Sequence, residues 1–278
     1  MLDRYMVSRL IDLWLAEDIG ACDLTCQVMI DPDATGAFRM NAREPMTVAG
    51  IEVAAMVFEH YDPTLEVTLS VKDGERVAPG TELLRVSGAA RSVLTGERTA
   101  LNIVQHLSGI ATETAKYVKE IAGTRARLID TRKTTPGLRM LEKHAVMCGG
   151  GANHRLGLDG GVMIKDNHIA VTGSITAAVA RARAGVPTLT KIEVECDRLD
   201  QVREALTAKA DVIMVDNMSL ENMREAVKIV GGSVPIEASG GVRLNTIRAI
   251  AETGVDFIST SRITQASQAV DIGLDDAA

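Results

Sequence analysis

The amino-acid sequence predicts an α/β protein in which an N-terminal α+β sandwich domain (residues 1–110) precedes an open or incomplete parallel (β/α) barrel (residues 111–278). In the second half, six short apolar runs each end at a polar residue. From Lys165 onward these ends lie 30, 21, 23 and 20 residues apart, which is the length of a strand, a helix and two loops. In the first half, short β-type runs alternate with turn signals, and one long helical pattern joins the two halves.

The polar residues that end the six runs favour a barrel over a doubly wound sheet. A doubly wound sheet concentrates its site at one switch point, whereas a barrel gathers side chains from every strand end. The segments between the runs support helices, since Ser174–Ala184 is followed by Gly185 and Ser219–Val230 by Gly231. Six such units predict a barrel that is open or incomplete. The residues at the run ends are Asp130, Lys165, Glu195, Asp216, Ser239 and Ser259.

The first domain is predicted to mix helices and strands and contains no obvious catalytic group. Residues 1–16 form an amphipathic helix that Asp18-Ile19-Gly20 ends, with Leu10, Ile11, Leu13, Trp14 and Leu15 along or near one side. A further helix is expected between the strands, and a long one after them. The expected strands cover residues 37–42, 65–71 and 82–88, and these helices cover residues 51–60 and 90–122.

The composition bounds the class of protein. A net charge of −7 argues against a general nucleic-acid surface, which needs a cationic footprint. The N-terminus is interrupted by charge too often for a signal peptide, and no apolar run approaches the roughly 18 residues of a membrane span, so we expect a cytoplasmic protein. Four scattered cysteines favour reduced thiols. Cys22 and Cys26 supply at most half of a thiolate metal site, because no Cys or His pair at ligand spacing completes it.

Cations are concentrated between Asp130 and His168, in a chain that is acidic overall. Arg132 and Lys133 follow one apolar run and Lys165 follows the next, which places them at predicted strand ends. His154 and Arg155 come from a loop after Gly149-Gly150-Gly151, whose glycines are expected to let the backbone approach a ligand closely. The cluster therefore indicates a small polyanionic ligand.

Two further groups at the predicted strand ends admit more than one interpretation. Glu195 and Asp216 are either helix caps or ion-pair partners of Arg132 and Lys165, or oxygen ligands for Mg²⁺. Ser239-Gly240-Gly241 is either a simple turn or a phosphate grip ahead of a helix expected to start near Asn245. Ser259-Thr260-Ser261, at the next strand end, supports the phosphate interpretation.

Lys165 also permits a rival mechanism. A lysine at the end of a barrel strand forms a Schiff base with a carbonyl substrate once its pKa is lowered, as in an aldolase-like enzyme. In that mechanism Lys165 would lie beside three further cations, Arg132, Lys133 and Arg155. A ligand with several carboxylates explains these four cations better than a carbonyl substrate does.

Three motifs, TRKTTPGLR, GGGANHRLGL and IKDNH, closely resemble the quinolinate phosphoribosyltransferase family in order and separation, and the resemblance covers nearly the whole chain. It implies a glycosyltransferase that joins quinolinate to phosphoribosyl pyrophosphate with decarboxylation. It implies that the catalytic residues are Lys133, Lys165, Glu195 and Asp216. It also implies that Glu195 and Asp216 hold a Mg²⁺ ion that binds with phosphoribosyl pyrophosphate. The implied substrate-binding residues are Arg98, Arg132, Lys133, His154, Arg155, Lys165, Glu195, Asp216, Ser239, Gly240, Gly241, Ser259 and Ser261.

Arg98 has a different interpretation without the resemblance. On a packed helix, an arginine at the edge of an apolar stripe covers its neighbours with its stem and keeps its charge in water. The segment GERTALN resembles the family segment whose arginine reaches the neighbouring subunit's site, which implies a homodimer or a dimer-based oligomer.

The chain departs from the family pattern in two places, and two alternatives remain. Cys22-Asp23 replaces an expected glycine-aspartate pair, and Ser259-Thr260-Ser261-Arg262 replaces a VGALT-like phosphate turn. A paralogue associated with molybdenum uptake resembles the family, but the intact IKDNH argues against it. A non-catalytic phosphometabolite-binding barrel would tolerate loss of Glu195 or Asp216, and both are present.

Overall fold

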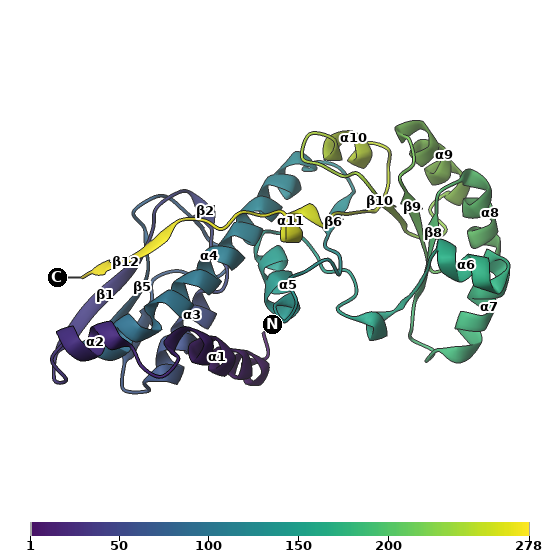
Figure 1. The fold of residues 1–278 in the computed structure, drawn as a ribbon. Helices are drawn as coiled ribbons and strands as arrows, with labels where there is room; N and C mark the ends of the chain where they lie inside the picture. Colours follow the sequence, from purple (N-terminus) through teal and green to yellow (C-terminus); the bar gives the residue numbers. More distant parts are fainter. Residues whose placement is uncertain (1, 278) are drawn as a thin grey trace. The chain divides into compact units, whose positions relative to one another are not determined.

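The computed structural model describes residues 2–277, which form two compact units. Unit 1 falls within Met1–Ala115, Met140–Gly150 and Ser267–Ala278, and unit 2 comprises Lys116–Arg139 and Gly151–Ala266. Figure 1 labels the helices and most of the strands of both units. Within the described residues, no helix combines the length and the apolar character needed to cross a membrane.

Unit 1 is built around an antiparallel sheet with the strand order β12-β1-β5-β3, and β2 and β4 form a separate pair. This confirms the predicted α+β character and the three expected strands. The strands are β1 (Thr35–Ala42), β2 (Met46–Thr47), β3 (Glu66–Leu69), β4 (Arg76–Val77), β5 (Glu82–Ala89) and β12 (Ile272–Asp276). The helices are α1 (Arg4–Ile19), α2 (Leu24–Met29), α3 (Ile51–Tyr61), α4 (Ala90–Glu120) and α5 (Arg139–Cys148).

Helix α1 shows how local sequence sets the ends and the buried face of an element. Asp3 caps the helix by accepting hydrogen bonds from the backbone N–H groups of the first turn, and Gly20 ends it with a φ of 59°. Val7, Ile11 and Leu15, spaced four residues apart, are buried. Leu13, expected on or near the apolar side, is 67% exposed, so the buried face is narrower than predicted.

Two segments that the predicted boundary left with the barrel belong to unit 1 in the structure, namely Met140–Gly150 and Ser267–Ala278. Strand β12 pairs with β1, and Asp275 accepts hydrogen bonds from Asn41 Nδ2 (2.8 Å) and Arg43 Nη2 (2.6 Å). Helix α5 is tied to α4 by His106 Nε2, which lies 2.9 Å from the buried carboxylate of Glu142. Pairing across more than 200 residues leaves no local pattern from which the boundary could be predicted.

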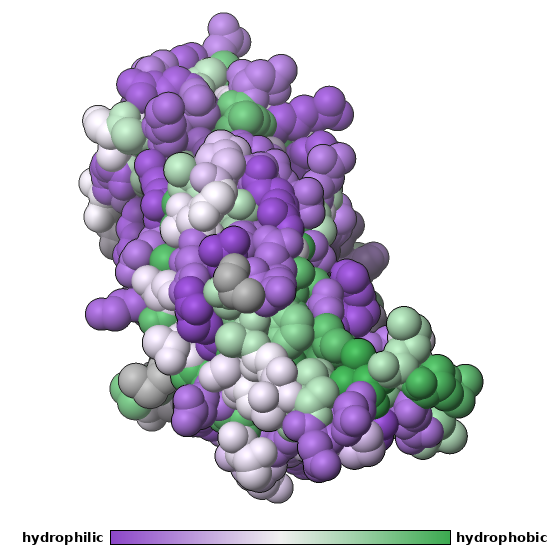
Figure 2. Space-filling view, turned by 90° about the vertical axis from the view of Figure 1, so that its left-hand side faces the viewer, coloured by the Kyte–Doolittle hydropathy of each residue, from purple (hydrophilic) through white to green (hydrophobic). Residues whose placement is uncertain are grey.

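Large apolar side chains remain exposed on the first two helices of unit 1. Such exposure matters when the side chains gather, because contiguous apolar surface is typical of protein–protein contacts. Figure 2 shows green surface gathered toward the lower right of the face that it views. The exposed apolar side chains of α1 and α2 are Tyr5, Met6, Leu13, Leu24, Val28 and Met29.

Unit 2 is an open barrel of parallel strands in the order β6-β11-β10-β9-β8-β7, which confirms the predicted architecture. The first strand, β6, pairs with the last, β11, while β6 and β7 occupy opposite edges, so the sheet does not close. A single parallel bridge joins Ile129 to Ala152 on the free side of β6. The strands are β6 (Arg127–Ile129), β7 (Val162–Ile164), β8 (Ile192–Cys196), β9 (Val212–Asp216), β10 (Ile236–Ser239) and β11 (Phe257–Ser259).

The helices of unit 2 begin where the capping residues predicted. Ser174 Oγ accepts the N–H of Ala177 at the start of α7, Ser219 Oγ accepts that of Asn222 at the start of α9, and Gly231 ends α9 in the left-handed region. Because all six strands are parallel, the polar residues at their carboxyl ends share one rim of the barrel. The helices are α6 (Asp166–Thr172), α7 (Ile175–Gly185), α8 (Leu199–Thr207), α9 (Leu220–Val230), α10 (Ile247–Ala251) and α11 (Arg262–Gln265), with a 3₁₀ turn at Leu158–Gly160.

Candidate active site

The carboxyl ends of the barrel strands line a pocket of about 630 Å³ in unit 2. Every predicted site residue except Arg98 lines it. Arg98 belongs to helix α4 in unit 1 and is exposed. The predicted residues that the pocket brings together are Arg132, Lys133, His154, Arg155, Lys165, Glu195, Asp216, Ser239, Gly240, Gly241, Ser259 and Ser261.

Buried Asp130 holds together the two segments that carry most of the cations. Its carboxylate accepts hydrogen bonds from Asn153 Nδ2 (2.7 Å) and from the backbone N–H of His154 (2.8 Å). The loop with His154 and Arg155 is thereby fixed to the end of β6, two residues before Arg132. Asp130 is fully buried, and these hydrogen bonds compensate its carboxylate for the loss of water.

Arg132 and Arg155 lie close enough for their charges to interact. The pKa of Arg155 is lowered by burial and by the positive charge of Arg132. Arg155 Nη1 donates to the carbonyl of Gly161 (2.9 Å), which holds the guanidinium in place despite this repulsion. Arg155, held in this way, lines the pocket together with Arg132, Lys133 and Lys165, and this cationic wall favours a ligand with more than one negative charge.

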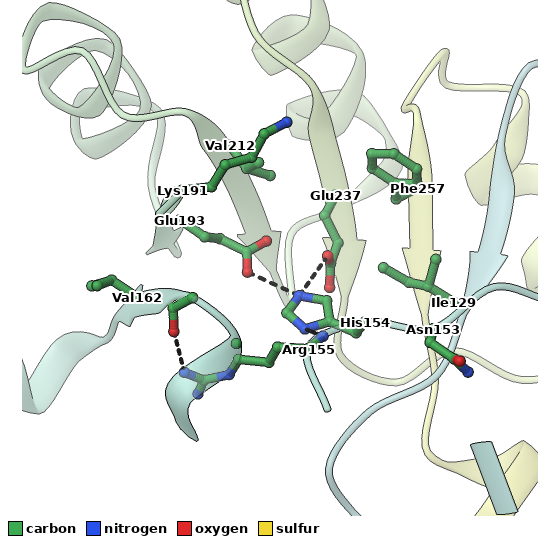
Figure 3. Close-up of a pocket in the computed structure, with 12 residues that line it drawn as sticks. Ile129, Asn153, His154, Arg155, Val162, Lys191, Glu193, Val212, Glu237 and Phe257 are labelled. Carbon is green, nitrogen blue, oxygen red and sulfur yellow. Dashed lines mark hydrogen bonds and ion pairs between the residues drawn. The ribbon is translucent and has the colours of Figure 1, made fainter. Parts of the chain in front are cut away.

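His154 lies between two buried glutamates, Glu193 and Glu237 (Figure 3). Its Nε2 is 3.0 Å from Glu193 Oε2 and 3.4 Å from Glu237 Oε2. Burial lowers the pKa of His154, but the two carboxylates raise it to about 9. For the Glu237 carboxyl, burial acts in the opposite direction and raises the pKa. Among the described residues, the Oε1 atoms of Glu193 and Glu237 lack a hydrogen-bond partner. One imidazolium between two carboxyls is therefore the stable arrangement.

The other nitrogen of His154 opposes protonation of the ring. The backbone N–H of Arg155 donates to Nδ1 (2.8 Å), a bond that only the neutral imidazole can accept. Such a bond contributes about 0.5–1.5 kcal/mol, whereas hydrogen bonds to charged groups contribute about 1.5–3 kcal/mol each. The two carboxylates therefore decide the balance, and the pKa of His154 stays above its ordinary value.

Lys165 and Glu195 form an ion pair across the neighbouring strands β7 and β8. Glu195 is thus an ion-pair partner of Lys165, one of the alternatives that the sequence left open. The Lys165 side chain is 44% exposed and lines the pocket, so a ligand can reach it without rearrangement of the strands. An ion-paired ammonium is not a nucleophile, and this arrangement gives the Schiff-base mechanism no support.

Asp216, at the end of β9, is held by its neighbour in the chain, since Asn217 Nδ2 donates to Asp216 Oδ2 (2.6 Å). The next strand end approaches this asparagine closely. A Cβ atom on Gly240, which has a φ of +86°, would lie 2.3 Å from Asn217 Oδ1. Gly240 is therefore required where the ends of β9 and β10 meet.

The helix expected to start near Asn245, after Ser239-Gly240-Gly241, is α10, which begins at Ile247 and has five residues. A helix of this length adds little dipole, so any anion at this rim is held by exposed backbone N–H groups and by the hydroxyls. Open space surrounds Gly241, whose φ of +62° turns the chain at the pocket wall.

The role expected for Gly149-Gly150-Gly151 is wrong. A Cβ on Gly149 would lie 2.5 Å from the carbonyl oxygen of Ala111 and 2.5 Å from Thr114 Cβ, both on α4. Gly149 therefore permits close packing of α5 against α4 within unit 1, and none of the three glycines lines the barrel pocket. Sequence shows that a glycine permits a close approach, but not what approaches it.

Glu193 and Glu237 were not predicted as site residues. Each stands two positions before a predicted one, Glu195 or Ser239, and alternate residues of a strand share a face. A charged residue inside an apolar parallel strand was the available signal, because such a strand is buried on both faces.

A second pocket of about 400 Å³ continues the barrel interior on the other side of His154 and Glu237 (Figure 3). It shares His154, Arg155 and Glu237 with the first pocket, and its remaining wall comes mainly from the starts of strands. Because active sites of parallel barrels lie at the carboxyl ends of the strands, the first pocket is the candidate active site.

Comparisons with known proteins match this architecture over both units. Residues 23–108 match the N-terminal domain, and residues 110–275 the C-terminal domain, of quinolinate phosphoribosyl transferase. The chain belongs to the quinolinate phosphoribosyltransferase family. A Synechocystis protein named probable nicotinate-nucleotide pyrophosphorylase [carboxylating] is 47% identical over 264 residues, which cover 94% of this chain and 89% of that protein. A Bacillus subtilis protein of the same name is 40% identical, covering 99% and 94%.

Solved structures of quinolinate phosphoribosyltransferase relatives share the fold. The crystal structure of NadC from Streptococcus pyogenes has a TM-score of 0.96 at 38% identity and covers 100% of this chain and 99% of that one. The nicotinate-nucleotide pyrophosphorylase of Francisella tularensis has a TM-score of 0.95 at 41% identity, covering 99% and 97%. The resemblance predicted from three motifs is thus confirmed over the full architecture.

Proposed function

We propose that this quinolinate phosphoribosyltransferase family member transfers the phosphoribosyl group of phosphoribosyl pyrophosphate to quinolinate. The products are nicotinate mononucleotide, pyrophosphate and CO₂. The observation that carries the proposal is the apposition of Arg132 and Arg155, with Lys133 and Lys165, on one pocket wall. Four cations that line one pocket are stabilised by a ligand with two carboxylates, and a dianion loses its water only against paired cations.

In the first step, the ring nitrogen of quinolinate attacks C1 of the ribose. A carbon–nitrogen bond forms as the bond from C1 to the pyrophosphate oxygen breaks, and the bonding electrons leave with pyrophosphate. Arg132, Arg155 and Lys165 hold the two carboxylates and so orient the nitrogen toward C1. Lys133, on the same rim, faces charge that develops as pyrophosphate departs.

In the second step, the ring loses the carboxylate next to its nitrogen. The ring nitrogen is now cationic, so the electron pair left when CO₂ departs sits beside a positive centre. A proton then takes the place of CO₂ on the ring carbon. This step needs little beyond a fixed orientation, to which the held guanidinium of Arg155 contributes.

Glu195 and Asp216 suit the ribose and a magnesium ion. They lie on neighbouring strands, β8 and β9, line the pocket, and offer the carboxylate oxygens that Mg²⁺ prefers. When bound, Mg²⁺ would neutralise charge on the pyrophosphate group. Entry of quinolinate gives Lys165 a new carboxylate partner, which frees Glu195 to accept hydrogen bonds from ribose hydroxyls.

The hydroxyl and glycine residues at the ends of β10 and β11 form the phosphate end of the proposed site. Gly241 turns the chain with open space at its α-carbon, so backbone N–H groups can approach an anion. Ser259 is buried at the end of its strand and Ser261 follows at the pocket wall. The proposed contacts to the 5′-phosphate are Ser239, Gly240, Gly241, Ser259 and Ser261.

Substrate comparison tests the proposal. Quinolinate, nicotinate and nicotinamide are each incubated with phosphoribosyl pyrophosphate and Mg²⁺, and pyridine nucleotide is measured. Quinolinate should be turned over and the other two should not, because one carboxylate or none leaves several cations of the wall unpaired. Equal rates with quinolinate and nicotinate would contradict the proposed function.

We also propose that the active protein is a homodimer in which Arg98 completes the partner subunit's site. Arg98 is exposed, and its neighbour Glu97 is half-buried with a pKa that burial raises, so this part of α4 resembles neither plain core nor plain solvated surface. The exposed apolar side chains of α1 and α2 supply surface of the kind that dimers bury.

Mixing of two inactive variants tests the dimer. Arg98→Ala and Lys165→Ala are combined under conditions that exchange subunits. About half of the dimers are then hybrids, each with one doubly defective and one intact site, so roughly a quarter of wild-type activity should return. If mass spectrometry confirms exchange and activity stays at the parental level, Arg98 does not act across subunits.

A further inference from the structure

Three side chains of unit 1 converge at a place distinct from the barrel pocket. His144 and Cys148 stand four residues apart on α5, and Asp73 belongs to the turn between β3 and β4. The side-chain atoms that can ligate a metal lie within 4.8 Å of one another. The proposed transfer reaction uses none of the three residues.

The separations of these atoms are close to those of a zinc site. His144 Nε2 lies 3.4 Å from Cys148 Sγ and 2.7 Å from Asp73 Oδ2. Around a tetrahedral zinc ion with bonds of about 2.0–2.3 Å, ligand atoms are about 3.4–3.6 Å apart. The His144–Cys148 separation therefore already matches a zinc site, and the His144–Asp73 separation needs to grow by less than about 1 Å.

The geometry differs from that of a nucleophilic triad. In a cysteine–histidine–acid triad, one imidazole nitrogen takes the proton of the thiol and the other is held by the acid. Here the single atom Nε2 of His144 faces both Asp73 and Cys148. Three donor atoms that point to one spot form a chelate and not a proton relay.

The ligand set is held in advance by contacts around it. The second carboxylate oxygen of Asp73, Oδ1, accepts the N–H of Ile51 at the start of α3 (3.0 Å), which leaves Oδ2 facing His144. Such outer contacts fix ligand orientation in metal sites. The side chains of His144 and Asp73 are 21% and 12% exposed, so an ion can enter from solvent.

We propose that Asp73, His144 and Cys148 form a zinc site in unit 1, with water in the fourth position. A thiolate, an imidazole and a carboxylate are ligands that zinc takes together, whereas Mg²⁺ takes oxygen ligands and leaves sulfur aside. The thiol of Cys148 loses its proton to solvent as the metal–sulfur bond forms. The bound ion ties the β3–β4 turn to α5 and stabilises unit 1.

Cobalt serves as the spectroscopic probe for this site. The full-length chain is reduced, treated with chelator, freed of both reagents, and titrated with Co²⁺. One equivalent should produce an intense near-ultraviolet thiolate-to-cobalt band with tetrahedral visible bands, and Zn²⁺ should abolish both. Zn²⁺ should also raise the Tm of the chain, because it binds the folded state. Absence of a thiolate band in the wild-type chain overturns the proposal.

Matched variants assign the signal to these residues. Cys148→Ser should remove the thiolate band, and Asp73→Asn, which keeps an acceptor for Ile51, should weaken zinc affinity at least about tenfold, since even outer-shell changes cost 10–100-fold. The control is Cys22→Ser, because Cys22 is also a free cysteine of intermediate burial. It should bind cobalt like the wild type. A band that survives Cys148→Ser, or that Cys22→Ser removes, overturns the assignment.

Discussion

Replacement of Lys165 by alanine is expected to lower kcat/KM for quinolinate by on the order of 10²–10³. Loss of one preorganised donor from a water-poor site costs about 2.7–4 kcal/mol. Lys165 follows β7, lines the pocket and pairs with Glu195. Steady-state rates with quinolinate and phosphoribosyl pyrophosphate measure the effect.

Two comparisons separate a contact with substrate from a merely structural ion pair. Lys191, an exposed lysine before β8, is the matched control, because it lines the second pocket, and Lys191→Ala should keep near-normal rates. Near-normal rates in Lys165→Ala would mean that Lys165 is only the ion-pair partner of Glu195. Borohydride trapping of a substrate adduct on the wild type would instead support the Schiff-base mechanism.

Replacement of His154 by alanine is expected to destabilise the fold by about 3–5 kcal/mol, the typical cost of leaving a buried charge without its partner. Glu193 and Glu237 are 6% and 1% exposed, so removal of the imidazole leaves their carboxylates facing each other. Urea unfolding measures the loss. Glu193→Gln in the same chain should restore part of it, because one of the two buried charges is then absent.

The pH dependence of stability supplies a second readout for this cluster. The folded-state pKa of His154 is about 9, above the roughly 6.5 of an unfolded histidine, so the folded state binds the extra proton. Its contribution is full below about pH 6.5 and is lost as the pH rises through about 9. His60→Ala is the control, since His60 pairs with Asp12 on the surface, where ion pairs contribute about 0–1 kcal/mol. Equal losses of unfolding free energy in His154→Ala and His60→Ala would contradict the role given to His154.

The sequence predicted the barrel because its signals are local. Each strand of unit 2 is a short apolar run with a polar residue at its end, and serine and glycine mark the ends of α7 and α9. Lys165 and Asp216 were therefore placed on one rim by counting residues. The motifs then predicted the family, which the comparisons confirmed over both units.

The parts that sequence did not predict depend on contacts between distant segments. Strand β12 joins the sheet of unit 1 beside β1, and no pattern within residues 267–278 predicts that β1 is the strand with which it pairs. Gly149 packs against α4, although its neighbours in sequence suggested a ligand loop. Glu193 and Glu237 are meaningful only once His154 lies between them.

Release of labelled CO₂ tests the central claim most directly. Quinolinate labelled in the carboxylate next to the ring nitrogen is mixed with phosphoribosyl pyrophosphate, Mg²⁺ and an excess of the full-length chain, and all products are measured in one turnover. The account predicts equal amounts of labelled CO₂, pyrophosphate and nicotinate mononucleotide, and no CO₂ when phosphoribosyl pyrophosphate is omitted. Pyrophosphate release with the label retained on the pyridine ring, or CO₂ release without the second substrate, would contradict it.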